Sequence, residues 1–147
     1  MPKLGDPTDF SYRISKVTKV VDGDTIDVII DMGFDIMYKS RVRLFGIDTP
    51  ESRTRNLDEK KRGLLAKKYL QEALKAGKTL SIKTYKDNET GKFGRILGDV
   101  FIDGKSVNAQ MVKDFMAVPY YGQSKQAIEK LHEANKLMLI KQGKISG

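Results

Sequence analysis

Residues 14–31 read ISKVTKVVDGDTIDVIID, in which two runs rich in β-branched residues flank an Asp-Gly pair. β-branched residues favour strands, and Asp-Gly between two such runs is a strong signal for a tight hairpin turn. The stretch therefore predicts two antiparallel strands, at residues 14–21 and 25–31, joined at Asp22 and Gly23. The fold is therefore expected to begin with a β-meander.

The chain that follows continues with a strand, a helix and two more strands. Residues 38–47 alternate between apolar and basic side chains, which indicates a third strand. Residues 57–76 have apolar side chains at helical spacing, with Asp58 as the expected N-cap. Residues 79–85 and 95–102 have the alternation of a fourth and a fifth strand.

Two more helices are expected near the C-terminus. Ser106 is placed to cap the first, which carries Val107, Met111 and Phe115 four residues apart. Ser124 is placed to cap the second, which is expected to run to residue 142. The apolar stripe expected on that last helix is Ala127, Ile128, Leu131, Ala134 and Met138.

The expected order of elements is three strands, a helix, two strands and two helices. This order is that of a five-stranded OB-type barrel with a helix between its third and fourth strands. The predicted fold class is therefore α+β, mainly β, with a five-stranded OB-fold β-barrel and three helices. We expect one domain over residues 14–147 and a flexible N-terminal leader over residues 1–13. Barrels of this type commonly present one face to nucleic acid or sugar.

The composition narrows the possible chemistry. The 147 residues include 27 Lys and Arg against 19 Asp and Glu, and the formal net charge of +8 favours a polyanionic partner. The absence of Cys excludes disulfides and thiol catalysis, and the single His excludes zinc sites built from several histidines. No apolar run is long enough for a transmembrane helix, so no membrane partner is expected. The first ten residues lack a secretory signal, so we expect an intracellular protein, bacterial or phage-encoded, or a mature secreted form.

Three clusters gather charged residues where a β-barrel usually has neutral turns. They are VDGDT at residues 21–25, RVRLFGIDTPE at residues 41–51 and GKFGR at residues 91–95. Each alone has an ordinary structural explanation: a hairpin turn, a solvated strand end with paired charges, and a β-turn with incidental basic residues.

Together, the three clusters supply the parts that phosphodiester hydrolysis requires. Asp24 and Asp48 offer hard carboxylate oxygens of the kind that Ca²⁺ or Mg²⁺ needs, and Glu51 could face the same space. Arg43 and Arg95 offer planar guanidinium groups that match phosphate oxygens. A hydrolytic site needs a cation on the phosphate, a group that prepares the water, and cations that stabilise the transition state.

The same segments resemble the staphylococcal nuclease (thermonuclease) family. The resemblance rests on VDGDT at 21–25, RLFGIDTPE at 43–51, KFGR at 92–95 and a V-N-x-x-x-V stretch at 107–112. It extends from about residue 17 to about residue 142, which is nearly the whole chain. Each motif is weak by itself, but their joint order, their spacing and the helix between them are specific.

The resemblance implies a Ca²⁺-dependent nuclease that hydrolyses DNA and RNA by water attack on phosphorus. Family enzymes cleave the P–O5′ bond and leave 3′-phosphate ends. The calcium ligands implied by the motifs are Asp24, Asp48 and the carbonyl of Thr49. The implied catalytic residues are Arg43, Glu51 and Arg95, with Glu51 as the group that either takes a proton from water or positions it. Because all six positions hold the residue types of the catalytic family, we expect a working enzyme.

Substrate-binding residues are expected in two further places. They are Lys92 in the KFGR motif, and Tyr120 and Tyr121 in a segment that only loosely resembles the family's aromatic-rich segment. Either tyrosine could instead be an ordinary core aromatic. Stacking of a base on a tyrosine ring tolerates any sequence, so the resemblance implies a preference for single-stranded substrates. The family also implies a monomer.

A non-catalytic OB-fold module that binds nucleic acid through its barrel and its basic first helix is the alternative function. The acidic residues separate the two hypotheses, because carboxylates that face a phosphate repel it and would weaken a pure binder. They favour the nuclease. The lone histidine, His132 in the last helix, is interpreted as structural or exposed.

Overall fold

The computed structural model describes residues 10–85 and 95–146. Its strands are β1 (Ser11–Asp22), β2 (Thr25–Asp31), β3 (Met37–Leu44), β4 (Ile47–Asp48), β5 (Leu80–Tyr85), β6 (Arg95–Ile102), β7 (Lys105–Ser106) and β8 (Val118–Pro119). Its helices are α1 (Leu57–Ala76), α3 (Val107–Lys113) and α4 (Lys125–Lys141). The predicted α+β class is therefore confirmed.

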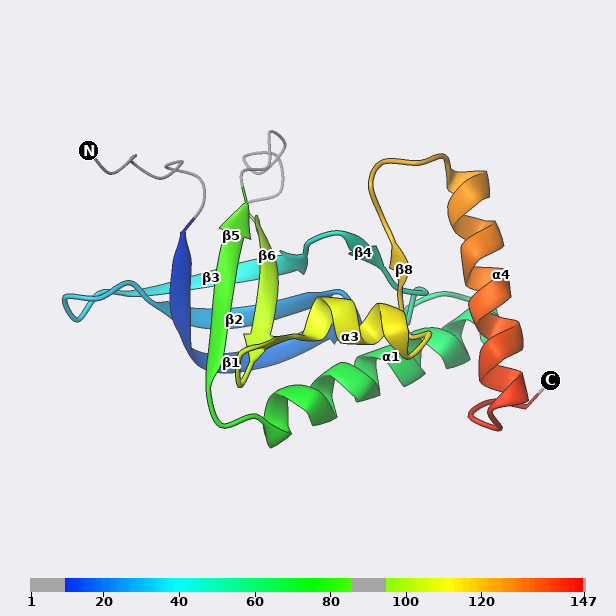
Figure 1. Cartoon of the computed structure of the whole chain (residues 1–147), viewed down its shortest axis with the longest axis horizontal. Coiled ribbons are helices and arrows are strands. Elements are labelled where there is room, and N and C mark those ends of the chain that lie inside the picture. Colours follow the sequence, from blue (N-terminus) through cyan, green and yellow to red (C-terminus); the bar gives the residue numbers. More distant parts are fainter. Residues whose placement is uncertain (1–9, 86–94, 147) are drawn as a thin grey trace.

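Strands β1, β2, β3, β5 and β6 close into the predicted OB-type barrel (Figure 1). The sheet order is β3-β2-β1-β5-β6-β7, and β3 also pairs with β6 in parallel, which joins the two ends. Fully buried aliphatic side chains fill the barrel, including Ile26, Val28, Ile30, Val42, Leu44, Ile82 and Val100. The alternation that predicted the strands thus reflects one face that packs inside a closed barrel.

Helix α1 runs beneath the barrel in Figure 1 and buries Ala66, Leu70 and Leu74 against it. Its predicted bounds are confirmed, but its N-cap is Asn56 rather than Asp58. The Asn56 side chain accepts a hydrogen bond from the Glu59 amide at 3.2 Å. Asp58 lies in the first turn, where its negative charge favours the helix N-terminus and pairs with the Lys136 ammonium at 2.7 Å.

Several strand boundaries differ from the prediction. β1 begins at Ser11, because residues 11–13 pair with β5, so the predicted leader overlaps the first strand by those residues. The predicted strand at residues 38–47 is divided at Gly46, whose positive φ of 78° turns the chain between β3 and β4. The two-residue strands β7 and β8 were not expected, since pairs this short leave no pattern in the sequence.

The last two helices also depart from the expected pattern. α3 ends at Lys113, so Phe115, with a φ of 64°, lies beyond the helix. On α4, which Ser124 caps as predicted, Leu131 is exposed although the predicted stripe includes it. Ala134, also in that stripe, is exposed as well. The apolar residue that α4 buries is instead Leu139, and polar side chains also face inward, since His132 and Asn135 form hydrogen bonds with residues before the helix.

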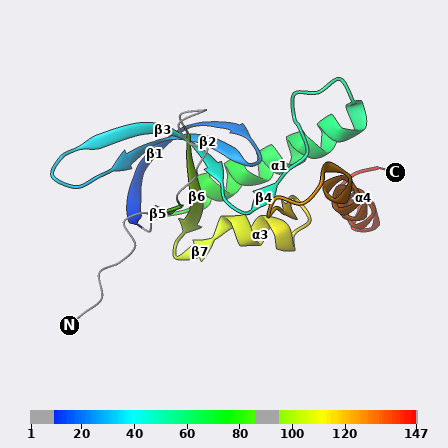
Figure 2. The same ribbon diagram turned by 90° about the horizontal axis from the view of Figure 1, so that it is seen from above.

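The β2–β3 hairpin and α4 lie at opposite ends of the molecule (Figures 1 and 2). The hairpin tip exposes Phe34 almost completely. The β1–β2 turn, at the other end of β2, therefore lies on the α4 side. Among the described residues, no helix combines the length and the apolar character that a membrane span requires.

Asn108, the asparagine of the V-N-x-x-x-V stretch, connects α3 to the barrel. It is 4% exposed; its Nδ2 donates to the carbonyls of Phe45 at 2.9 Å and Gly98 at 3.2 Å, and its Oδ1 accepts from the Val100 amide at 3.2 Å. Buried polar groups left without partners are costly. This asparagine therefore fixes the chain that follows β3.

We expect Asn108→Ala to lower the free energy of unfolding by about 3 kcal/mol, because it leaves the Phe45 carbonyl and the Val100 amide unpaired. Urea denaturation measures this loss. Lys113→Ala, an exposed change in the same helix, is the control and should differ from the wild type by less than about 0.5 kcal/mol. An Asn108→Ala protein as stable as this control would show that the three hydrogen bonds do not support the fold.

Candidate active site

Asp24 sits in the tight turn between β1 and β2, where α1 approaches the backbone closely. A Cβ on Gly23 would lie 2.8 Å from the Ala66 Cβ, so the turn can contact the helix because this residue is glycine. The Asp24 side chain is 13% exposed. One of its oxygens accepts from the Thr25 hydroxyl at 3.0 Å, and the other accepts from the Thr49 amide at 3.2 Å. These bonds orient the carboxylate toward the end of β3.

Asp48, at the end of β4, contacts the side chains of His132 and Arg43, which come from α4 and β3. Its Oδ2 lies 2.8 Å from His132 Nε2 of α4, and its Oδ1 lies 3.5 Å from Arg43 Nη2. β4 pairs with β8 through Ile47 opposite Pro119 and Asp48 opposite Val118. The carboxylate is thus held by the strand pair from one side and by α4 from the other.

Arg43 joins the two predicted metal ligands. Its guanidinium lies 3.3 Å from an Asp24 oxygen through Nη1 and 3.5 Å from an Asp48 oxygen through Nη2, and its side chain is only 16% exposed. Nη1 also donates to the Leu44 carbonyl at 3.2 Å. Arg43 is therefore within ion-pair distance of both carboxylates, as the sequence predicts for residues that act together.

Glu51 lies near the same carboxylates, after the Thr-Pro pair. Partial burial raises the pKa of its carboxyl, and the negative charges of Asp22, Asp24, Asp48 and Glu59 raise it further. A Cβ on Gly63 would lie 2.3 Å from the Glu51 carbonyl oxygen, so α1 packs directly on the backbone of this residue. Burial is the larger cause of the raised pKa, and the additional effect of the four acids shows that several carboxylates converge here.

Asp24, Asp48 and Glu51 form an acidic cluster, and Asp22 adds a fourth carboxylate to it. Neither Asp22 nor its partner Ser52 is predicted from the sequence as a site residue. The Ser52 hydroxyl donates to the Asp22 carboxylate, and Arg53 lies 3.6 Å from the same carboxylate. Ser52 is buried. These contacts tie the loop that carries Glu51 to the end of β1.

The donor set fits a hard divalent cation such as Ca²⁺. The residues that the structure describes contain no ready-made cage of three acidic or histidine side chains. However, the carboxylates of Asp22, Asp24, Asp48 and Glu59 all act on Glu51, and the ion pairs that the described residues form with Asp22, Asp24 and Asp48 come from Arg43, Arg53 and His132. The buried Thr49 hydroxyl also finds no hydrogen-bond partner among these residues. Oxygen ligands with excess negative charge are what Ca²⁺ selects.

Arg95 and Lys92 are the remaining predicted residues on the nucleic-acid side of the site. The Arg95 backbone begins β6 and pairs in parallel with Arg41, which places this position beside the strand that carries Arg43. The role of its side chain stays a prediction. Lys92 lies outside the described residues, so its predicted contact with substrate stays a prediction too.

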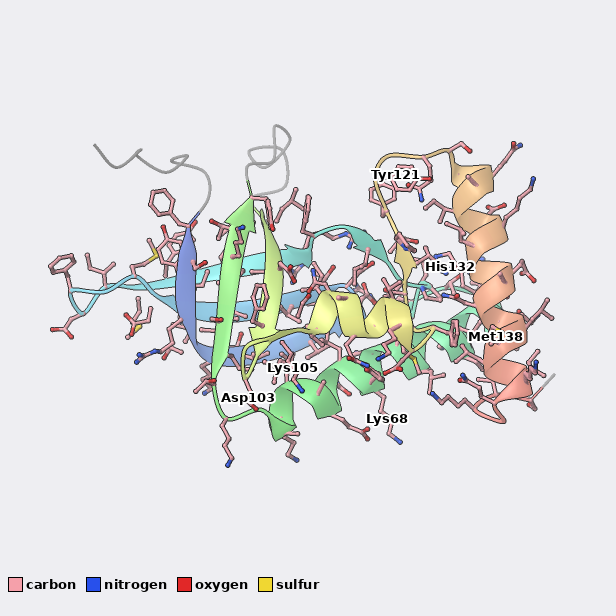
Figure 3. All side chains as sticks on the ribbon, in the orientation of Figure 1. Lys68, Asp103, Lys105, Tyr121, His132 and Met138 are labelled. Atoms are coloured by element: carbon pink, nitrogen blue, oxygen red, sulfur yellow. The ribbon has the colours of Figure 1, made fainter. Side chains whose placement is uncertain are left out.

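Tyr120 and Tyr121 lie beside the acidic cluster and not in the core. They are 45% and 80% exposed, and both line a cavity of about 730 Å³ together with Arg43 and Asp48. The Tyr120 amide donates to the Gly46 carbonyl at 2.8 Å, which holds the segment against the turn after β3. Figure 3 shows Tyr121 on the loop between β8 and α4. The core-aromatic interpretation is therefore wrong for both residues.

The contact of His132 with Asp48 is the main feature that the sequence does not reveal. His132 is 13% exposed on its side chain, and Figure 3 shows it on the barrel side of α4. It is not exposed, and it binds a predicted metal ligand that lies 84 residues earlier in the chain. The sequence carries no local signal for a contact of that separation.

Comparison with known proteins gives consistent matches. The profile of the family described as staphylococcal nuclease homologue matches residues 41–141, more than half of the chain. Endonuclease YncB of Bacillus subtilis (strain 168) is 35% identical over 99 residues, which cover 67% of this chain and 44% of that protein. The SPbeta prophage-derived endonuclease YokF of the same organism is 36% identical over 99 residues, covering 67% of this chain and 31% of the relative. A probable staphylococcal-like nuclease, CAN1 of Oryza sativa subsp. japonica, is 39% identical over 82 residues, covering 56% and 22% respectively. The chain thus spans less than half the length of these relatives.

Proposed function

Because the chain belongs to the staphylococcal nuclease family, we propose that it is a Ca²⁺-dependent nuclease that hydrolyses DNA and RNA. The relatives named as endonucleases support this proposal at the level of the family. The proposed reaction cleaves the P–O5′ bond and leaves 3′-phosphate ends.

The observation that carries the proposal is that Arg43 binds both Asp24 and Asp48, while Glu51 lies near the same two carboxylates. A module that only binds nucleic acid would gain from arginine and lose from every carboxylate, since each acid repels the phosphate. A hydrolase needs both signs of charge, because the acids serve a cation and a water molecule while the arginine serves the phosphate. The arrangement therefore favours catalysis over binding alone.

In the proposed reaction the chain's own residues orient the water and the phosphate. Glu51 prepares the attacking water, whose oxygen bonds to phosphorus as the P–O5′ bond breaks. The water gives up a proton to Glu51 or to solvent, and the departing O5′ takes up a proton and leaves as a 5′-hydroxyl. Arg43 and Arg95 hold the phosphate oxygens and stabilise the charge of the transition state. Asp24, Asp48 and the Thr49 carbonyl would hold Ca²⁺, which when bound neutralises charge on the phosphate.

The two exposed tyrosines support a preference for single strands. Tyr120 and Tyr121 line the same cavity as Arg43. A base must leave its stack to lie on either ring, and stacking on an aromatic side chain contributes about 1–3 kcal/mol whatever the base. We therefore propose single-stranded DNA and RNA as the preferred substrates.

Analysis of product ends tests the proposed reaction. Labelled single-stranded DNA and RNA are incubated with the protein and Ca²⁺, and the 3′ ends are identified by their sensitivity to a 3′-phosphatase. We expect 3′-phosphates from both substrates. Strands that are bound but stay whole would favour the non-catalytic module, and 3′-hydroxyl products would contradict the proposed bond cleavage.

His132 gives a test of the proposed metal ligands that does not depend on turnover. Its imidazole holds Oδ2 of Asp48 at 2.8 Å, and loss of such an outer contact typically lowers metal affinity by about 10–100-fold. We expect His132→Ala to weaken Ca²⁺ binding within that range, as measured by calorimetric titration.

Two further variants separate this effect from helix docking. His132→Gln keeps an N–H donor and should recover part of the Ca²⁺ affinity. Asn135→Ala removes a different polar contact of α4, the hydrogen bond to the Ala117 carbonyl at 3.0 Å, and should leave Ca²⁺ affinity near the wild type. If His132→Ala binds Ca²⁺ like the wild type, the histidine does not position Asp48.

A further inference from the structure

A groove between β1 and α1 lies outside the candidate active site. Its volume is about 690 Å³, and its walls carry four lysines, Lys16 and Lys19 from β1 and Lys67 and Lys75 from α1. The lining is otherwise neutral, with Val20 and Leu74 among its apolar residues. The groove thus combines an aliphatic floor with basic walls.

The local geometry of both elements places the lysines on the groove. Lys67 and Lys75 are eight residues apart on α1, so they lie on one face of the helix, separated by about 12 Å along its axis. Lys16 and Lys19 are three residues apart and would point to opposite faces of a regular strand. An irregularity in the β1–β2 pairing between Val17 and Lys19 breaks the alternation, and both lysines are exposed.

The four lysines are poorly balanced by acids. Among the described residues, Lys16, Lys67 and Lys75 form no ion pair, and no carboxylate lines the groove. Lys19 acts electrostatically on Asp27, but that carboxylate already accepts two hydrogen bonds from Arg41, at 2.8 and 3.2 Å. The groove therefore presents a concentrated positive charge that an anionic ligand can balance.

One end of the groove leads to the acidic cluster. Lys67 directly follows Ala66, which packs against the β1–β2 turn at Gly23, next to Asp24. On the strand side, Val20 is two residues before Asp22. Figure 1 shows α1 and β1 running alongside each other toward this turn. A strand bound in the groove can therefore continue into the candidate active site.

We propose that the β1–α1 groove binds the sugar–phosphate backbone of single-stranded nucleic acid, a few nucleotides away from the phosphate that is cleaved. The inference rests on the proposed nuclease function and adds to it a second, remote contact with the substrate. Phosphates contact the lysines of both walls, and the sugars lie over the aliphatic floor. Long substrates are held in this way and dinucleotides are not.

Binding measured without cleavage tests the groove. Fluorescence anisotropy in excess chelator compares a labelled 20-nucleotide DNA with a labelled dinucleotide across a series of salt concentrations. We expect the double variant Lys67→Ala/Lys75→Ala to bind the long strand about tenfold more weakly. The slope of log K against log salt should fall by about 1.4, since each phosphate contact with a single strand contributes about 0.7. Dinucleotide binding should not change.

Matched variants control for net charge. Lys68→Ala/Lys141→Ala removes the same charge away from the groove: Lys68 extends from α1 away from the strands in Figure 3 and pairs with Glu72, and Lys141 ends α4. This control should keep the wild-type slope. Lys16→Ala/Lys19→Ala, on the opposite wall, should reproduce the loss seen with the α1 variant.

Equal losses in the groove variants and the control, or an equal loss for the dinucleotide, would overturn the proposal. Retained DNA binding with lost binding to phosphatidylglycerol vesicles would also overturn it and would indicate a membrane surface instead. Because the assay needs no turnover, a wild-type protein that binds DNA through the groove but never cuts it would contradict the nuclease function alone.

Discussion

Replacing Glu51 by glutamine is expected to lower the rate of DNA cleavage by about 10²–10⁴-fold, the range for loss of a general acid–base group. The amide keeps the shape of the side chain but cannot take a proton from water or hold it with a negative charge. Single-turnover cleavage of labelled single-stranded DNA in saturating Ca²⁺ measures the effect. An unchanged rate would remove Glu51 from the mechanism.

The same variant, although slower in cleavage, should be at least as stable as the wild type. Burial and four neighbouring carboxylates raise the pKa of Glu51 in the fold, so its charged form opposes folding at neutral pH. Glu51→Gln removes that charge and should melt at or above the wild-type temperature in chelator. Glu72→Gln, an exposed change on α1 where the partner is Lys68, is the control and should keep the wild-type rate. A strongly destabilised Glu51→Gln would indicate a structural role.

Arg43→Lys is expected to lower the rate by about 10²–10³-fold, as the loss of a preorganised transition-state donor does. The guanidinium reaches Asp24 and Asp48 with two different nitrogens, and an ammonium is a single point of charge. Because the variant keeps the net charge, a lower cleavage rate would show that the planar geometry of the guanidinium is required. The same single-turnover assay measures it.

Arg41→Lys is the matched control for Arg43→Lys. Arg41 lies two residues earlier on β3, is half exposed, and pairs with Asp27 and not with the acidic cluster. Its replacement should leave the rate within about twofold of the wild type, as expected for a residue that binds no substrate. Wild-type turnover in Arg43→Lys, or equal losses in both variants, would show that the phosphate contact is wrongly assigned.

The barrel and part of the site could be predicted from the sequence because their signals are local. The Asp-Gly pair predicts the β1–β2 turn to within one residue: the turn itself is at Gly23 and Asp24, because Asp22 still pairs with Thr25. The alternation of residues 38–47 indicates which side of β3 carries Arg43. Asp24 and Asp48 then follow from their places at strand ends. Local signals also predicted α1, which has the expected bounds.

The contacts of α4 could not be predicted, because they join residues far apart in the chain. Apolar periodicity assumes that the most hydrophobic stripe packs inward, and on α4 it selected Leu131. The helix instead buries Leu139, and polar contacts also orient it, among them His132 on Asp48 and Asn135 on the Ala117 carbonyl. Polar docking of this kind leaves no periodic pattern, so the one histidine could not be connected to the site.

The basic groove could be predicted only in part for a similar reason. Lys67 and Lys75 share a helix face that the sequence reveals. Regular alternation along β1 would place Lys16 and Lys19 on opposite faces of the sheet. They reach the same groove because the pairing of β1 is locally irregular. The charge of the chain indicates a polyanionic ligand, but only the fold indicates where the ligand enters.

The rate of cleavage of end-labelled single-stranded DNA, measured against free Ca²⁺, tests the central proposal most directly. Parallel series contain excess chelator and Mg²⁺, whose stricter octahedral geometry suits this donor set less well. We predict no cleavage in chelator and a rate that rises with Ca²⁺ and saturates. DNA that is bound in a salt-sensitive way but stays whole with every metal, or cleavage that persists in chelator, would contradict a Ca²⁺-dependent nuclease.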